Sequence, residues 1–96
     1  ILSTPNEQAL SSLDDEQKSV LKGLTTALHN CQWDAESIGG AIPQAAKDME
    51  YSPRSAYRAA YAALMGLEKG PRLAPILAEM DKKHIMNLLD SCCQLL

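Results

Sequence analysis

Apolar residues recur at helical spacing in the long segments of this chain, and no segment shows the strict alternation of a strand. One apolar stripe consists of Val20, Leu21, Leu24, Ala27 and Leu28. The last stripe consists of Ile85, Leu88, Leu89, Cys92 and Leu96. Such spacing puts the apolar side chains on one face of a helix. The pattern predicts an all-α fold, and 96 residues are enough for one small domain with one core.

Residues that favour helix ends divide the chain into five or six short helices. Thr4-Pro5 predicts a first helix that ends near Ser12, with Thr4 as its N-cap. The later predicted starts are Asp14, Asp34, Ser52-Pro53, a start near Arg72, and Asp81. We expect these helices to pack as a compact orthogonal bundle. Residues 1–13 form a tether or a short helix in this scheme, and residues 14–96 form a single helical domain.

Glycine and proline residues interrupt or end several of the predicted helices. Gly39-Gly40 and Pro43 interrupt the third segment, and the proline predicts a kink or a break there. Gly66 suits the end of the fourth helix. The fifth helix is expected from about Arg72 to Met80, with Pro75 tolerable only near its first turn.

The charge distribution indicates which half of the chain would meet an anion. The net charge is −3, which argues weakly against a general nucleic-acid binder, so no DNA partner is expected. Residues 1–50 contain three lysines and eight acids, a net of −5, whereas residues 51–96 contain six cations and four acids, a net of +2. An anionic ligand should therefore meet the second half.

Several classes of protein find no support in the sequence. No apolar run approaches the length of about 20 residues that spans a bilayer. The three cysteines lack zinc-ligand spacing and predict reduced thiols in a cytoplasmic protein. The phosphate-loop, nucleophile-elbow and zinc-protease motifs are absent, and His29 and His84 are lone histidines. No catalytic residue and no metal ligand is therefore predicted.

The segment from residue 54 to residue 72 combines tyrosines with cations. Arg54 and Arg58 lie four residues apart on one helix face, and Tyr57 and Tyr61 form a parallel row. Aromatic rings beside cations suit an unstacked base and its phosphate. The alternative is that the tyrosines belong to the core and the arginines are simply solvated.

A basic turn follows this helix. Lys69 and Arg72 flank Gly70-Pro71 at the start of the next helix, where free N–H groups favour an anion. The same turn would also serve as a plain corner between two helices. Lys82 and Lys83 are a further basic pair, for which phosphate contact and simple solvation both remain open.

The stretch "SPRSAYRAAYAALMGLEKGPRLAPILAEMDKKHIMNLL" resembles the C-terminal domain of class I lysyl-tRNA synthetases. The likeness extends from about Leu13 to Asp90 and includes the Trp33-Asp34 pair. The more specific pieces are the Tyr-x-Ala-Leu-x-Gly run and the Lys-Gly-Pro-Arg turn. The resemblance implies an α-helix-cage anticodon-binding domain, related to that of the glutamyl-tRNA synthetases.

This resemblance implies a role in binding the anticodon loop of lysine tRNA. Tyr61 occupies the position of an arginine that helps to recognise a base in the glutamyl family, and Gly70 occupies that of a threonine, so both depart from that family. The expected RNA-binding residues are Arg54, Tyr57, Arg58, Tyr61, Lys69, Gly70, Arg72, Lys82 and Lys83. The chain lacks the HIGH and KMSKS signatures, so ATP and magnesium would belong to a catalytic domain outside it. A chain that starts at Ile1 without a methionine fits a piece of a longer protein.

A helical protein-interaction module without RNA binding is the alternative function. In that case the acidic residues between 14 and 50 would meet a basic partner, and Arg72 would not matter.

Overall fold

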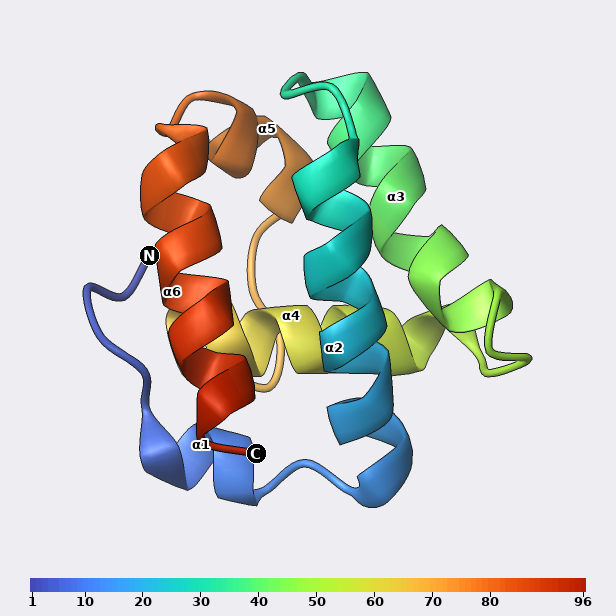
Figure 1. Ribbon diagram of the computed structural model, residues 1–96, viewed down its shortest axis with the longest axis vertical. Coiled ribbons are helices and arrows are strands. Elements are labelled where there is room, and N and C mark those ends of the chain that lie inside the picture. The colour runs from blue at the N-terminus through green and yellow to red at the C-terminus, as the bar shows by residue number, and fades with distance from the viewer.

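Helices supply all the regular structure of the chain. A computed structural model describes residues 1–96 and contains no strand (Figure 1). The elements are α1 (Glu7–Ser11), α2 (Asp15–Asn30), α3 (Ala35–Lys47), α4 (Pro53–Met65), α5 (Leu73–Ala78) and α6 (Lys82–Gln94). The all-α prediction with five or six short helices is confirmed. None of these helices has both the length and the apolar character needed to cross a membrane.

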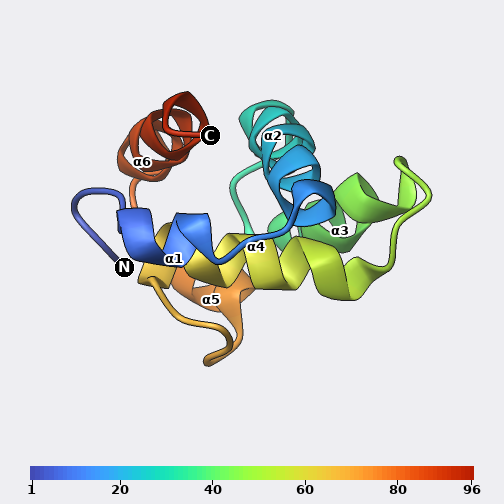
Figure 2. The ribbon, with the colours of Figure 1, turned by 90° about the horizontal axis from the view of Figure 1, so that it is seen from below.

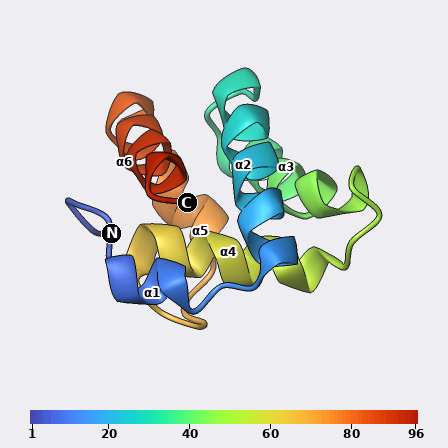
Figure 3. The ribbon, with the colours of Figure 1, turned by 60° about the horizontal axis from the view of Figure 1, so that its bottom comes forward.

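Helix α4 is the centre of the bundle. It crosses α2 and α6, which stand together on one side of it, while α5 lies on the opposite side (Figures 1, 2 and 3). Its buried face consists largely of small side chains, namely Ser55, Ala56, Ala59, Ala60, Ala62, Ala63 and Leu64. Small side chains allow neighbouring helices to approach closely, because interaxial distance depends on the residues at the contact.

Most helix starts follow the predicted caps. The carboxylate of Asp14 accepts a hydrogen bond from the amide of Gln17 at 2.7 Å, and Asp34 accepts one from Ser37 at 2.7 Å. Ser52 and Asp81 cap α4 and α6, with Pro53 at the first position of α4. Each cap satisfies an amide that the helix itself leaves free. Four of the predicted helix starts are therefore confirmed.

The first helix begins two residues later than predicted. Asn6, and not Thr4, is the N-cap of α1, and its side chain accepts from the amide of Ala9 at 3.1 Å. Asparagine is as good a cap as threonine or better. The Asn6 side chain also packs against Gly66 at the end of α4, a contact that the local sequence does not reveal.

Of the two outcomes predicted at Pro43, a kink or a break, the break does not occur. Helix α3 runs without interruption through Pro43. A proline removes one hydrogen bond from the helix interior. Ile38 and Ile42 before it, and Ala45 and Ala46 after it, are all buried in the core. Packing on both sides of the proline thus keeps the helix continuous. Helix α5 is also shorter than predicted: it spans Leu73–Ala78, with Arg72 as its N-cap and Pro75 in the first turn.

The first thirteen residues pack onto the bundle. Leu10 and Leu13 are buried, and the amide of Leu2 donates to the carbonyl of Leu64 at 2.8 Å. Helix α1 lies along α4 (Figures 2 and 3). Residues Glu7–Ser11 of this segment form a short helix that packs on the bundle.

Candidate functional site

Helix α4 and the turn that follows it shape two neighbouring hollows on the side of α4 away from α2 and α6. Figure 2 shows the 66–72 segment and α5 on this side. The rings of Tyr57 and Tyr61 line both hollows. The tyrosine row thus forms a wall between two spaces of different chemistry.

The first space, called here the cationic hollow, has a volume of about 360 Å³. Its lining residues are Arg54, Tyr57, Arg58, Tyr61, Glu68 and Lys69. Arg54 and Lys69 are exposed and form no ion pair. Three cations face one acid in this hollow, so its net charge favours an anion although the whole chain is acidic.

Arg58 is the most constrained cation of the cationic hollow. Its side chain is only 22% exposed, and one guanidinium nitrogen lies 3.5 Å from a carboxylate oxygen of Glu68. The same nitrogen donates to the hydroxyl of Ser12 at 3.4 Å. These contacts hold the guanidinium between α4, the segment after α1 and the 66–72 turn, so less side-chain entropy is lost when it binds a ligand.

The second space, called here the apolar hollow, lies between α3, α4 and α5 and has a volume of about 240 Å³. Its lining residues are Gly39, Ile42, Tyr57, Tyr61, Arg72, Leu73 and Ala74. Arg72 is exposed and is the one charged residue of this lining. An apolar space with a single cation suits a flat ring attached to a charged group.

Tyr61 ties the basic turn to α4. Its hydroxyl lies 3.1 Å from the carbonyl oxygen of Gly70 and 2.6 Å from that of Pro71. A Cβ atom on Gly70 would approach the Tyr61 ring to 3.4 Å, so the turn passes directly against the ring. The hydroxyl of Tyr61 is therefore used within the protein, and the residue also lines both hollows.

The two tyrosines are only partly buried. Tyr57 is 36% exposed. Tyr61 is half-buried and packs against the edge of the core. Alanines fill the inner face instead. The alternative in which both tyrosines belong to the core is therefore wrong.

Arg72 stands at the start of α5. It is the N-cap, and its side chain accepts no hydrogen bond, so no side chain caps the first amides of this helix. Arg72, Lys69 and the tyrosine row belong to the same face of the molecule, as the two hollows show.

Lys82 and Lys83 lie outside both hollows. The ammonium of Lys82 donates to the carbonyls of His29 and Cys31, at 3.0 and 3.2 Å, and lies 5.8 Å from the ring centre of Trp33. It therefore closes the C-terminal end of α2, where a cation is favoured. Lys83 is exposed on α6. The structure does not bring this predicted pair together with the other candidate residues.

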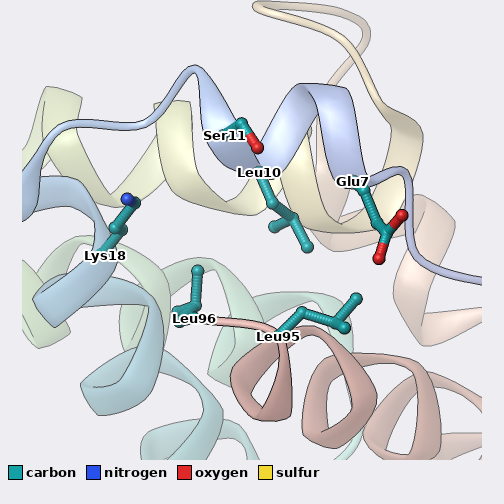
Figure 4. Close-up of a pocket in the computed structure, with 6 residues that line it drawn as sticks. All are labelled: Glu7, Leu10, Ser11, Lys18, Leu95 and Leu96. Atoms are coloured by element: carbon teal, nitrogen blue, oxygen red, sulfur yellow. The ribbon is translucent and has the colours of Figure 1, made fainter.

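A third hollow, of about 290 Å³, opens between α1, the start of α2 and the end of α6 (Figure 4). Its lining residues are Glu7, Leu10, Ser11, Lys18, Leu95 and Leu96. One acid balances one base there, and no aromatic ring is present. This composition gives no preference for an anionic ligand.

Sequence reasoning missed Glu68 and the α3 wall of the apolar hollow. Glu68 stands directly before Lys69, and that adjacency of opposite charges was the available signal. Gly39 and Ile42 lie some 20 residues before the tyrosine row in the chain, so only the packing of α3 on α4 brings them there. No local pattern identifies such a contact.

The lining of the two hollows has the chemistry that suits a single-stranded nucleic acid. Exposed aromatic rings give bases a stacking surface, and unpaired cations beside them attract the backbone. The family comparison agrees with this chemistry: residues 3–91 match the model of the anticodon binding domain family. The chain belongs to the anticodon-binding domain family.

The similar proteins indicate in which kind of enzyme such an anticodon-binding domain occurs. The chain is 31% identical over 80 residues to a lysine–tRNA ligase of Methanocaldococcus jannaschii, a match that covers 83% of this chain and 15% of that protein. It is 32% identical over 94 residues to a lysine–tRNA ligase of Aeropyrum pernix, covering 96% of this chain and 17% of that protein. The chain thus spans about a sixth of the length of these relatives. No solved structure matches it.

Proposed function

We propose that this chain is the anticodon-binding domain of a class I lysyl-tRNA synthetase and binds the anticodon loop of lysine tRNA. The observation that carries the proposal is the row of Tyr57 and Tyr61 between the cationic and apolar hollows, in a chain of the anticodon-binding domain family. The similarity to lysine–tRNA ligases supports the choice of tRNA.

The proposed contacts divide into phosphate and base contacts. Arg54, Arg58, Lys69 and Arg72 bind phosphates, since their charged groups surround the tyrosine row. A base stacks on the exposed ring of Tyr57, and a stacked base contributes about 1–3 kcal/mol. Gly70 contacts RNA only through its backbone. With so few cations, we expect a Kd of about micromolar or weaker at physiological salt.

The chain acts in this proposal by holding the tRNA, and it carries out no chemical step itself. The amino acid is activated with ATP and magnesium in a catalytic domain outside the chain, to which the anticodon-binding domain orients the tRNA. The partners are therefore the tRNA anticodon stem-loop and that catalytic domain, and not DNA. We propose a cytoplasmic location, which is in keeping with this role.

A titration of the 96-residue chain with the anticodon stem-loop of lysine tRNA tests the proposal. We expect binding that weakens steeply with salt and weakens further when the anticodon is scrambled. Equal affinity for the scrambled loop would contradict the specific role, and no binding to either loop would contradict RNA binding altogether.

A charge reversal gives the matched control. Arg72→Glu should lower the affinity at least about tenfold, because it replaces a phosphate contact by a repulsion. Lys22→Glu makes the same charge change on an exposed residue of α2 outside both hollows, and should have a much smaller effect. If both variants behaved alike, the contact surface would be wrong.

A further inference from the structure

The N-terminal segment touches two parts of the cationic hollow without lining it. Ser12, which follows α1, accepts a hydrogen bond from the guanidinium of Arg58 at 3.4 Å. Asn6, which caps α1, packs against Gly66, where α4 ends and the 66–72 turn begins. Neither Ser12 nor Asn6 belongs to the lining of the hollow. Any effect of α1 on a ligand there must therefore pass through Arg58 or the turn.

The hydroxyl of Ser12 is oriented by the helix that it ends. It donates to the carbonyl oxygen of Ala9 at 2.7 Å, and a hydroxyl has a single proton to donate. The oxygen therefore presents a lone pair to the Arg58 nitrogen and acts there only as an acceptor. Helix α1 thus determines which side of the Ser12 hydroxyl faces the guanidinium.

Helix α1 is itself anchored at both ends. The buried side chains of Leu10 and Leu13 flank Ser12 in the chain and attach this end of the helix to the core. At the other end, Asn6 packs against the end of α4. Figures 2 and 3 show α1 lying along α4 between these points. The two anchors therefore hold the Ser12 hydroxyl next to Arg58.

The contact with Ser12 leaves most of the Arg58 guanidinium free for a ligand. One nitrogen makes both protein contacts, to the Ser12 hydroxyl at 3.4 Å and to the Glu68 carboxylate at 3.5 Å. A guanidinium has five N–H donors, and two of them can bind a phosphate side by side. The hydroxyl is also uncharged, so unlike the carboxylate it holds the guanidinium without reducing its attraction for a phosphate.

We propose that Ser12 is a positioning residue, which orders Arg58 in the free protein for binding an RNA phosphate. A long side chain that becomes ordered only in the complex loses conformational entropy on binding, and a side chain held in place beforehand avoids part of this loss. This inference rests on the proposed function, in which Arg58 is a phosphate contact. It adds a residue that acts through Arg58 and does not itself touch the RNA.

The first experiment needs no RNA and measures the order of the Arg58 side chain. Nitrogen relaxation of its Nε–Hε group in the free 96-residue chain gives an order parameter. Ser12→Ala should lower this order parameter, and Ser12→Thr, which keeps a hydroxyl, should retain the wild-type value. Ser11→Ala removes the neighbouring exposed hydroxyl, which makes no hydrogen bond to Arg58, and should leave the order parameter unchanged. An order parameter that is the same in Ser12→Ala as in the wild type overturns the inference.

The second experiment is a double-mutant cycle on binding of the lysine stem-loop. Ser12→Ala alone should weaken binding about two- to fivefold, the effect of one more side chain that becomes ordered on binding. In an Arg58→Met background the same substitution should have no effect, because methionine neither donates to a hydroxyl nor binds a phosphate. A merely structural role of Ser12 would weaken binding equally in both backgrounds, and that result overturns the inference alone, as does wild-type affinity in Ser12→Ala. Wild-type chain that does not bind the stem-loop overturns the proposed function and this inference together.

Discussion

The hydroxyl of Tyr61 lies 2.6 Å from the carbonyl oxygen of Pro71 and fixes the path of the basic turn relative to α4. The bond joins a helix side chain to the backbone ten residues later in the chain. The turn carries Lys69 and leads directly into Arg72, so its position sets where these cations stand. The ring and the hydroxyl of one residue therefore have separate tasks: the ring lines both hollows, and the hydroxyl holds the turn.

Tyr61→Phe separates these two tasks. The variant keeps the ring and loses the hydrogen bond, so we expect the free energy of unfolding to fall by about 1 kcal/mol. Amide hydrogen exchange in the 66–72 turn should become faster, because the turn loses its anchor. Affinity for the lysine stem-loop should fall less than in Tyr61→Ala, which removes the stacking surface as well. Unchanged exchange in the turn would show that the hydroxyl is not its anchor.

Arg54 and Arg58 should differ in what they stabilise. Arg54 is exposed and unpaired, so Arg54→Gln should leave the thermal midpoint unchanged and reduce the slope of log affinity against log salt by about 0.7, the value for one phosphate on a single strand. Arg58→Gln should reduce the slope and also lower the thermal midpoint, because Arg58 contacts Ser12 and Glu68.

Lys22→Gln is the control for both arginine variants, since Lys22 is exposed on α2 outside the two hollows. It removes one positive charge without touching either hollow. Titrations at several salt concentrations, together with thermal melting, measure the two effects. A slope change in Lys22→Gln as large as in Arg54→Gln would count against a localised contact.

Gly66 and Gly40 should respond in opposite directions to the same substitution. Gly66 has a positive φ of 67°, and a Cβ there would lie 2.9 Å from the side-chain nitrogen of Asn6. Gly66→Ala should therefore destabilise the fold by about 1–2 kcal/mol. Gly40 is exposed within α3 and a Cβ there would meet no atom within 4 Å, so Gly40→Ala should stabilise it by about 0.5–1 kcal/mol. Urea unfolding measures both changes in the free energy of unfolding. If the two changes had the same sign, the predicted contrast between Gly66 and Gly40 would be wrong.

The thiol of Cys92 should make stability fall at alkaline pH. Burial, with a smaller contribution from the neighbouring Cys93, raises its pKa to about 11 from an ordinary value of 9.0. Well below pH 9 the thiol is protonated in both states. Above it, the unfolded chain loses the proton while the folded chain retains it, so the free energy of unfolding declines as the pH rises from 9 towards 11, by up to about 2 kcal/mol.

Cys92→Ala provides the comparison for this pH effect. The variant lacks this thiol and is otherwise the same protein, so it should show a flatter decline over the same pH range. Denaturant unfolding at several pH values measures the two curves. Parallel curves would show that Cys92 does not contribute to the pH dependence.

The helix starts were predictable where one interaction within the helix itself determines them. The capping carboxylates of Asp14 and Asp34 act within their own helices, so the sequence alone predicts them. The start of α1 was predicted two residues early because Asn6 also packs against Gly66, a contact across the fold. The continuity of α3 through Pro43 likewise depends on burial of residues on either side of the proline, which local propensity does not include.

The candidate site was predictable in its cations and tyrosines and less so in its geometry. Arg54, Tyr57, Arg58 and Tyr61 share one helix, and helical spacing alone brings them together. The bond from Tyr61 to the turn depends on how the 66–72 segment folds back, and no spacing rule describes that path. For Lys82, charge alone suggested a phosphate contact, whereas the position of α2 gives its ammonium two carbonyl partners.

The hydrogen bond from Arg58 to Ser12 means that removing the residues before Leu13 would change the candidate site. Ser12 lies after α1, so a shortened chain that begins at Leu13 loses both the hydroxyl and the helix that covers this side of α4. Arg58 would then keep Glu68 as its sole protein partner, and its guanidinium would adopt more rotamers before binding. RNA affinity measured on such a chain would be that of a protein with a less ordered Arg58. The difference in binding free energy between the shortened and the 96-residue chain would measure the contribution of α1 and Ser12 to RNA binding.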